Sequence, residues 1–304
     1  MPFDSSVAPH IRAVLVQGKL DTALVLVAHH AIADGLSLAY AIRDTLSALS
    51  GDPLEPLAAL PSQGDMFDLG DVAAREQDAP AGESARYRPL DGAPPEVRGL
   101  SLPRFLTRKL RQRARQMRTT VHGALSAAIA IAGRRVFSAW EDEPVRLITP
   151  INMRPLLGLR DECGLLVSSA TSALDGRATR FWELACSAKI ALAAGQKRES
   201  IAAGLSAVAR VVGDGLDVAG AAELAANAFA HEAVLTNLGE LPFTQPFGAL
   251  KLEQVWGPAV LNGMEGAHTI GAATLNECVC LTHTSHSPCN GLLEAMRDVL
   301  VEAC

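Results

Sequence analysis

Apolar residues near the start of the chain follow the spacing of two β-strands. Residues 11–16 and 22–28 are apolar and rich in β-branched side chains, and the turn-forming residues 17–19 separate them. This pattern predicts two strands joined by a turn. The second run alternates too little for a strand with one face in water, so we expect it to be buried on both faces.

The next segment changes to helical spacing. Asp34-Gly35 interrupts the chain, and apolar side chains then recur every three or four residues up to Ser50-Gly51, at Leu36, Leu38, Ile42, Leu46 and Leu49. Such spacing is typical of an amphipathic helix. Residues 29–35, which begin with His29 and His30, are therefore predicted to form a loop between a buried strand and a helix.

Prolines mark the residues that follow. Residues 52–104 contain Pro53, Pro56, Pro61, Pro80, Pro89, Pro94, Pro95 and Pro103. We interpret this stretch as a crossover linker that lies on the surface, and as the best domain boundary. It divides the chain into a first subdomain, residues 1–92, and a second, residues 105–304.

Helical and strand-like segments interleave beyond the linker. Helices are predicted at residues 108–118, 119–132, 181–194, 201–212 and 292–301, and strands at 145–155, 164–171, 233–239 and, as a pair, within 268–283. Thr119 or Thr120 is a suitable N-cap for the second of these helices. Interleaved elements of both kinds predict an α/β or α+β fold.

Composition and charge exclude several classes of protein. Of the 304 residues, 49% are hydrophobic and 20% charged, which is enough for a large core and argues against disorder. The net charge of −6 argues against a nucleic-acid binder. The sequence has no apolar run as long as a membrane span and no secretory leader, so we expect reduced cysteines and a cytoplasmic location.

The residues around His30 have the chemistry of an active site. An imidazole titrates close to neutral pH, so His30 at the end of a rigid strand could take up a proton. Asp34 could order the loop by pairing with an arginine or capping the next helix, and the Gly35 N–H could approach an oxyanion. From the residues alone, a buried histidine pair beside an ordinary Asp-Gly turn remains an alternative. A metal site is disfavoured, since adjacent histidines on a strand point to opposite faces.

Two further clusters have competing interpretations. Zinc could bind within residues 278–289, where thiols and imidazoles are close together, at Cys278, Cys280, His283, His286 and Cys289. Ordinary sheet residues are the better interpretation, because Cys278 and Cys280 share one strand face and His283 lies on the other. His122 and His231 are expected to be structural. The basic run at 109–118 is either a solvated helix face or a patch for the phosphates of coenzyme A or phosphopantetheine.

The segment His29-His30-Ala-Ile-Ala-Asp34-Gly35 resembles the HHxxxDG signature of the condensation-domain superfamily of acyltransferases. This superfamily includes condensation domains, alcohol acyltransferases and wax-ester synthases, with chloramphenicol acetyltransferase as a distant relative. Later segments resemble the family's helix and strands in the same order, at residues 119–125, 149–155, 164–168 and 236–239. Within the superfamily the chain looks most like polyketide-associated, stand-alone acyltransferases related to the phthiocerol dimycocerosyl transferase group.

The resemblance implies a chloramphenicol acetyltransferase-like fold of two similar subdomains. Family members place on the order of a hundred residues before the signature, a substantial part of a domain, whereas 28 residues precede it here. We therefore expect the first subdomain to be incomplete, with the missing part belonging to a longer form of the protein or to a partner chain.

The resemblance also implies roles for individual residues. His30 would be the general base, His29 a supporting residue, and Asp34 a structural residue that pairs with an arginine, for which Arg154 is the candidate. Asn237 is a candidate tunnel-lining residue.

The implied reaction is transfer of an acyl group to a hydroxyl or amine from a thioester of coenzyme A or an acyl carrier protein, in polyketide or lipid biosynthesis. It needs no metal or redox cofactor. Two alternatives remain: a fragment of a nonribosomal peptide condensation domain, and a catalytically inactive binding module of the same fold.

Overall fold

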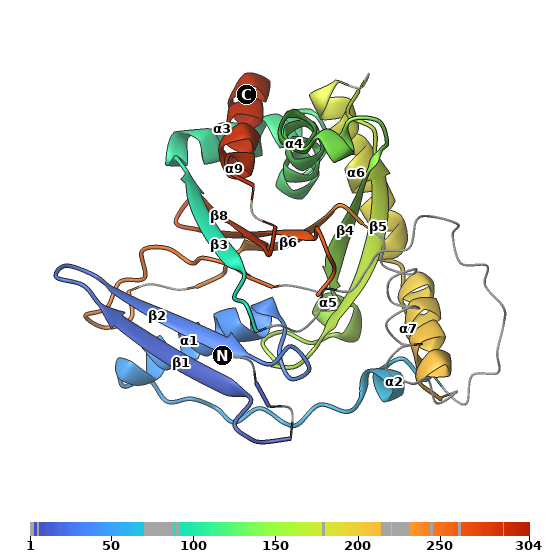
Figure 1. Cartoon of the computed structure of the whole chain (residues 1–304). Coiled ribbons are helices and arrows are strands. Elements are labelled where there is room, and N and C mark those ends of the chain that lie inside the picture. The colour runs from blue at the N-terminus through green and yellow to red at the C-terminus, as the bar shows by residue number, and fades with distance from the viewer. Residues whose placement is uncertain are drawn as a thin grey trace.

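A six-stranded mixed sheet forms the centre of the protein in the computed structural model (Figure 1). Its strands, in the order in which they lie side by side, are β3 (Glu96–Leu102), β8 (Cys278–Ser285), β7 (His268–Leu275), β6 (Ala233–Glu240), β4 (Val145–Asn152) and β5 (Val167–Leu174). The pairs β4–β6 and β6–β7 are parallel and the other three are antiparallel. The structure describes residues 3–4, 6–69, 88, 92–177, 180–213, 220, 231–243, 246–260, 263–287 and 289–304.

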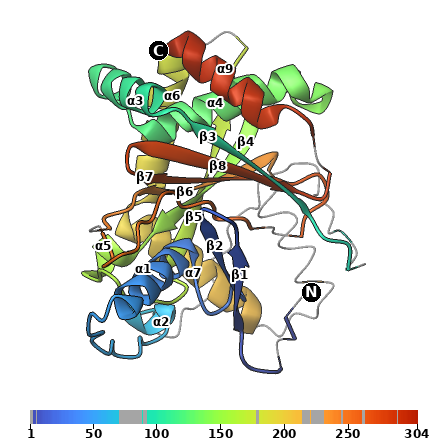
Figure 2. The ribbon, with the colours of Figure 1, turned by 90° about the vertical axis from the view of Figure 1, so that its left-hand side faces the viewer.

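One face of the sheet is covered by a layer of helices (Figures 1 and 2). The layer consists of α3 (Arg104–Gln116), α4 (Val121–Val136), α6 (Phe181–Gly195) and α9 (Leu292–Ala303). The central helix, α4, begins at Thr120, whose side chain accepts a hydrogen bond from the Gly123 N–H as an N-cap. Most of α4 is buried and built from small residues, which lets α6 and α9 pack closely on either side of it.

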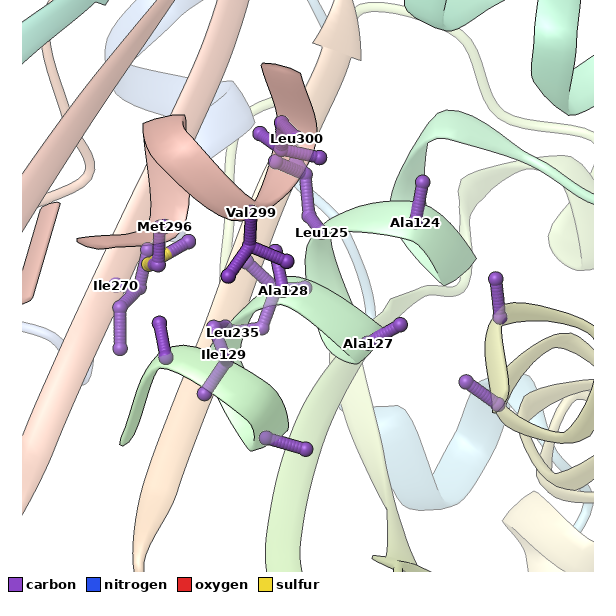
Figure 3. Packing of buried hydrophobic residues seen from close by; sticks show 14 of the residues in the cluster. Ala124, Leu125, Ala127, Ala128, Ile129, Leu235, Ile270, Met296, Val299 and Leu300 are labelled. Atoms are coloured by element: carbon purple, nitrogen blue, oxygen red, sulfur yellow. The ribbon is translucent and has the colours of Figure 1, made fainter. Parts of the chain in front are cut away.

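The main core lies between this helix layer and the sheet. Figure 3 shows Leu125 of α4 beside Leu300 of α9, and Met296 of α9 beside Ile270 of β7. These side chains are almost completely removed from solvent. This core is mainly aliphatic, and its burial stabilises the layer by the hydrophobic effect.

The opposite face of the sheet looks toward an N-terminal hairpin and helix (Figures 1 and 2). The hairpin is β1 (Ile11–Gln17) with β2 (Thr22–Ala28), and the helix is α1 (Gly35–Leu49). The other elements in the described part of the chain are α2 (Gln63–Met66), η1 (Ser138–Trp140), α5 (Arg154–Leu157) and α7 (Arg198–Gly213). The expected mixture of helices and strands is confirmed.

The expectation that β2 is buried on both faces is wrong. Val14 of β1 pairs with Val25 of β2, and these side chains remain 50% and 45% exposed. Within the described residues the two strands pair only with each other. Val16 and Val27, on the same face as this pair, are likewise exposed. The apolar pattern identified the strands correctly but not the number of layers packed against them.

The predicted linker also differs from the structure. Residues 96–102 form β3, an edge strand that pairs with β8 along its whole length. The prolines nearest to β3 lie at residues 94, 95 and 103, outside the strand, where they interrupt no ladder hydrogen bond. The short helix α2 also falls within the linker, and residues 70–87 and 89–91 lie outside the described part of the chain.

Candidate active site

The signature residues occupy the loop between β2 and α1. His29 and His30 follow β2 directly, and Asp34 is the N-cap of α1, with its Oδ1 accepting a hydrogen bond of 2.8 Å from the Ser37 N–H. His30 is exposed to solvent and His29 is half-buried. The loop that carries the two imidazoles is therefore fixed at one end by β2 and at the other by the capped start of α1.

Hydrogen bonds distinguish the two imidazoles. Nδ1 of His30 lies 3.0 Å from the carbonyl oxygen of Ala33, which can only accept, so this nitrogen carries the proton. Nδ1 of His29 accepts a hydrogen bond of 3.2 Å from the Ala31 N–H, so a neutral His29 carries its proton at Nε2. Only His30 thus presents an unprotonated Nε2 that can take up a proton.

Asp34 does not contact His30 but forms a buried ion pair with Arg154. Nη1 of Arg154 lies 2.8 Å from Oδ2 of Asp34, and Nη2 lies 3.1 Å from Oδ1. The side chains are 2% and 1% exposed. The Leu166 N–H donates to the Asp34 carboxylate, and the Arg154 Nε donates to the carbonyl oxygen of Glu162. These additional hydrogen bonds offset the cost of removing both charges from water.

Ser37 completes this network, a role that its place in the sequence did not reveal. Its hydroxyl oxygen accepts hydrogen bonds from Nη2 of Arg154 at 2.9 Å and from the Gly164 N–H at 3.0 Å. Its hydroxyl proton can go to Asp34 Oδ1 or to the Gly164 carbonyl oxygen, both at 2.9 Å. The only signal in the sequence was a serine three residues after a helix-capping aspartate.

A second ion pair joins α1 to the loop at residues 158–166, which also contributes Gly164 and Leu166 to the Asp34 network. Nη1 of Arg43 lies 2.5 Å from Oδ2 of Asp161, and the side chains are 23% and 45% exposed. The loop at residues 158–166 therefore holds α1 at its N-terminus, through the buried network, and again two turns further along. The signature loop is positioned by residues more than a hundred positions away in the sequence.

Two side chains from the sheet side, those of Pro258 and Leu238, closely approach the backbone at Gly35. A Cβ atom at this position would lie 2.5 Å from Cγ of Pro258 and 3.0 Å from Cδ2 of Leu238. Such separations are far below van der Waals contact. Gly35 is therefore needed for packing, and an additional role of its N–H toward an oxyanion stays a prediction.

Replacing Gly35 with alanine is expected to destabilise the protein by about 1–3 kcal/mol, the usual cost of overpacking a tight site. The measurement is the midpoint of thermal or urea unfolding. Gly204 of α7 is a matched control, since nothing lies within 4 Å of its Cβ position and alanine is the better helix former. We expect Gly204→Ala to leave stability unchanged or raise it, and an equal effect of the two substitutions would contradict the packing role.

The other candidate residues have local roles. The side-chain oxygen of Asn237 accepts a hydrogen bond of 2.9 Å from the Gly239 N–H, at an irregularity in the β6–β7 pairing. Its place in a tunnel wall stays a prediction. Within the described residues, no three His, Cys, Asp or Glu side chains gather in a way that could hold a metal ion. The zinc interpretation of residues 278–289 therefore gains no support.

His283, one of the candidate zinc ligands, instead pairs with another histidine in the core. Its Nε2 lies 3.0 Å from Nδ1 of His268, and both side chains are buried. The Phe137 ring lies 4.4 Å from the His268 ring, centroid to centroid. Burial lowers the pKa of each imidazole to about 4, with the neighbouring His283 adding to the effect at His268 and Arg98 at His283. Burial also lowers the pKa of His122 to about 4.

These lowered pKa values predict a protein that loses stability in mild acid. The unfolded chain binds protons at the three imidazoles near pH 6.5, whereas the folded chain does so only near pH 4. Their contribution is therefore fully present above pH 6.5 and is lost as the pH falls toward 4. Urea midpoints measured from pH 8 to pH 4 should fall in this window, and less steeply in a His283→Phe variant. A midpoint that stays constant from pH 7 to pH 5 would contradict the prediction.

The basic run forms the solvent-exposed side of α3. Leu106, Leu110 and Ala114 are buried, and the cationic side chains point away from them. Arg111 makes two hydrogen bonds to the carboxylate of Glu240 at the end of β6. A shallow groove runs along this side, lined by Arg108, Arg111, Gln112, Arg115, Gln116 and Glu277. No described helix has the length and apolar character required to cross a lipid bilayer.

Comparison with known proteins gives a consistent family and fold. Residues 92–278 match the family model described as phthiocerol/phthiodiolone dimycocerosyl transferase C-terminus. The structure is similar to that of polyketide synthase associated protein 5 from Mycobacterium tuberculosis, with a TM-score of 0.66 and 18% identity over 99% of this chain and 78% of that one. No curated protein matches the chain.

Two further structures extend the likeness. The first condensation domain of the CDA synthetase has a TM-score of 0.62 and 16% identity, over 96% of this chain and 66% of that one. The wax ester synthase/diacylglycerol acyltransferase from Marinobacter aquaeolei VT8 has a TM-score of 0.55 and 15% identity, over 97% and 70%. At these identities the likeness establishes the condensation-domain, chloramphenicol acetyltransferase-like fold. The chain spans about two thirds to three quarters of the length of these proteins.

Proposed function

Because the chain belongs to the phthiocerol/phthiodiolone dimycocerosyl transferase C-terminus family, we propose that it is an acyltransferase with His30 as its general base. The acyl group would move from a thioester of coenzyme A or a carrier protein to a hydroxyl or amine. The observation that carries the proposal is the geometry of His30. Its ring is exposed, and the bond from Nδ1 to the Ala33 carbonyl oxygen leaves Nε2 free to accept a proton.

The proposed reaction proceeds in two steps. Nε2 of His30 takes the proton of the acceptor O–H or N–H while the acceptor oxygen or nitrogen attacks the thioester carbonyl carbon. The tetrahedral intermediate then collapses, the C–S bond breaks, and the imidazolium returns the proton to the leaving sulfur. The products are an ester or amide and a free thiol. The Ala33 carbonyl oxygen, hydrogen-bonded to Nδ1–H, favours the imidazolium form during the reaction.

The role proposed for Asp34 is structural. Both of its carboxylate oxygens are occupied by hydrogen bonds from Arg154, Ser37 and Leu166. A carboxylate held in this way cannot orient His30 as the third member of a catalytic triad would. Asp34 instead fixes the start of α1 and with it the loop that carries His30.

The donor thioester is proposed to bind near the basic side of α3. Leu238 of β6 approaches Gly35, and two residues further along Glu240 binds Arg111. In Figure 2, α3 lies above and α1 below the same left-hand end of the sheet. Cationic side chains at this end suit the phosphates of coenzyme A, or the phosphopantetheine arm and acidic surface of a carrier protein.

The exposed hairpin favours a second candidate function. Four valines on one face of β1 and β2 are more than 40% exposed, namely Val14, Val16, Val25 and Val27. Such a surface is typical of an interaction site, as in an inactive binding module that has kept the fold. The two candidates differ in whether the protein releases thiol from acyl thioesters. A peptide-forming condensation domain would differ from both in requiring an amine acceptor.

The test is an acyl-transfer assay with the whole chain. The protein is incubated with coenzyme A thioesters of several chain lengths, together with alcohols or amines. Free thiol is followed with a chromogenic reagent and the ester or amide by mass spectrometry. Thiol release that requires both protein and acceptor, with one product formed per thiol, is the expected result. No release above the rate in buffer with any pair would overturn the proposal in favour of a binding module.

A further inference from the structure

A three-residue segment lies against the sheet beside the signature loop. We call Trp256, Gly257 and Pro258 the strap. The carbonyl oxygen of Pro258 accepts a hydrogen bond of 3.1 Å from Thr282 of β8, and its ring is the group that approaches Gly35. One end of the strap is therefore fixed to the sheet and to the loop that carries His30.

The other end of the strap rests on glycine. A Cβ atom at Gly99 of β3 would lie 2.8 Å from Cζ3 and 3.1 Å from Cε3 of the Trp256 indole. The indole therefore lies directly on the β3 backbone, where only glycine leaves room for it. An aromatic ring seated in this way is held by its contacts and is not a loose surface side chain.

The indole lies on the face of the sheet that carries the signature loop. Leu100 and Leu102 of β3 point into the core under the helix layer, so Gly99 and Val97 belong to the opposite face. Pro258 lies two residues after Trp256, and two residues of extended chain span at most about 7 Å. Trp256 is therefore a near neighbour of the loop that Pro258 contacts.

Trp256 and Val97, which is two residues before Gly99 on the same face of β3, are both exposed apolar side chains. Trp256 is 46% and Val97 52% exposed, whereas the other two tryptophans, Trp140 and Trp182, are buried at 6% and 8%. An indole that is ordered on one side and open on the other offers apolar contact area with little loss of side-chain entropy. We define Trp256, Val97 and Gly99 as the indole platform.

We propose that the indole platform binds the acyl chain of the thioester and that Trp256 is a specificity-determining residue for chain length. The inference rests on the proposed acyltransferase function. The platform presents an indole, a valine and a glycine, which suits an alkyl chain and offers nothing to a charged group. Since Pro258 of the strap contacts Gly35, a chain bound beside Trp256 would lie close to the loop that carries His30.

Tryptophan fluorescence tests the proposal without any need for turnover. The protein has three tryptophans, and Trp256 is the exposed one. The probes are non-hydrolysable S-alkyl coenzyme A thioethers with chains of 2, 8 and 16 carbons. We expect the 16-carbon probe to shift the emission to shorter wavelength in a saturable manner, and free coenzyme A and the 2-carbon probe to leave it unchanged. The Trp256→Phe variant should lose the signal.

Calorimetry with the same probes measures the effect on affinity. Trp256→Ala and, as a second variant, Val97→Gln should each weaken binding of the 16-carbon probe, by about tenfold for Trp256→Ala, and leave free coenzyme A binding unchanged. Ile190→Ala is the matched control, since Ile190 is 71% exposed on α6 in the helix layer. Equal affinities of wild type, Trp256→Ala and Val97→Gln for the 16-carbon probe would overturn the proposal.

The two proposals fail in different ways. If long-chain probes bind through Trp256 but no thioester is consumed, the platform stands as a binding site and the acyltransferase function fails. If thiol release proceeds in Trp256→Ala with the same KM for every chain length as in wild type, the function stands and the platform is overturned.

Discussion

Replacing His30 with alanine is expected to lower acyl transfer by about 10²–10⁴-fold, the range over which a general base contributes. The hydrogen bond from Nδ1 to Ala33 leaves Nε2 of His30 as the basic nitrogen of the loop. Because the side chain is exposed, its removal leaves no cavity, and the unfolding temperature should change little. Thiol release gives kcat and KM, and thermal unfolding monitors the fold.

His29 is the natural control for this experiment. Its ring is half-buried, makes edge contacts with His10 and Phe3, and accepts a hydrogen bond from Ala31. His29→Ala should therefore lower stability and have a smaller effect on kcat than His30→Ala. If His30→Ala turned over at the wild-type rate, or if the two variants lost activity equally with unchanged stability, the assignment of His30 as base would be rejected.

Features that depend on neighbouring residues could be predicted from the sequence. Helical spacing and the N-cap residues at Asp34 and Thr120 indicated where α1 and α4 begin, because a helix start is determined by a few adjacent side chains. The strand–loop–helix context of the signature followed for the same reason. The resemblance also identified Arg154 as a candidate partner for Asp34, and the structure brings the two side chains together.

Features that depend on contacts between distant residues could not be predicted from the sequence. The apolar sequence of β2 is the same whether its faces are covered or exposed, so it did not reveal the exposed valines. Ser37 gains its role from Arg154 and Gly164, which lie more than a hundred residues further along. The close packing at Gly99 and Gly35 likewise depends on Trp256 and Pro258, which lie far along the chain, so the sequence could not reveal it.

The signature loop is held from two sides by different kinds of interaction. On the side of residues 152–166 the contacts are charged and buried, through Arg154 and the backbone of Gly164. On the side of β6 and the strap they are apolar, through Leu238 and Pro258. Since buried charge pairs have strict geometry and apolar contacts do not, the first set is expected to determine the orientation of the loop.

Breaking the buried ion pair is therefore expected to have the largest effect on stability. Arg154→Ala leaves the Asp34 carboxylate buried without its counter-charge, which typically costs about 3–5 kcal/mol. Asp34→Ala should cost a similar amount and also remove the N-cap of α1. In a chain of this size such losses lower the unfolding temperature by on the order of 10 °C. Activity should fall with them, because the loop that carries His30 loses its anchor.

The exposed pair of Arg111 and Glu240 supplies the matched control. These side chains are 30% and 52% exposed, so Arg111→Ala should cost no more than about 1 kcal/mol. The double variant Asp34→Ala/Arg154→Ala should be less destabilised than the sum of the single variants, because neither charge is then left unpaired. A normal melting curve for Asp34→Ala, or additive effects in the double variant, would mean that the pair does not anchor the loop.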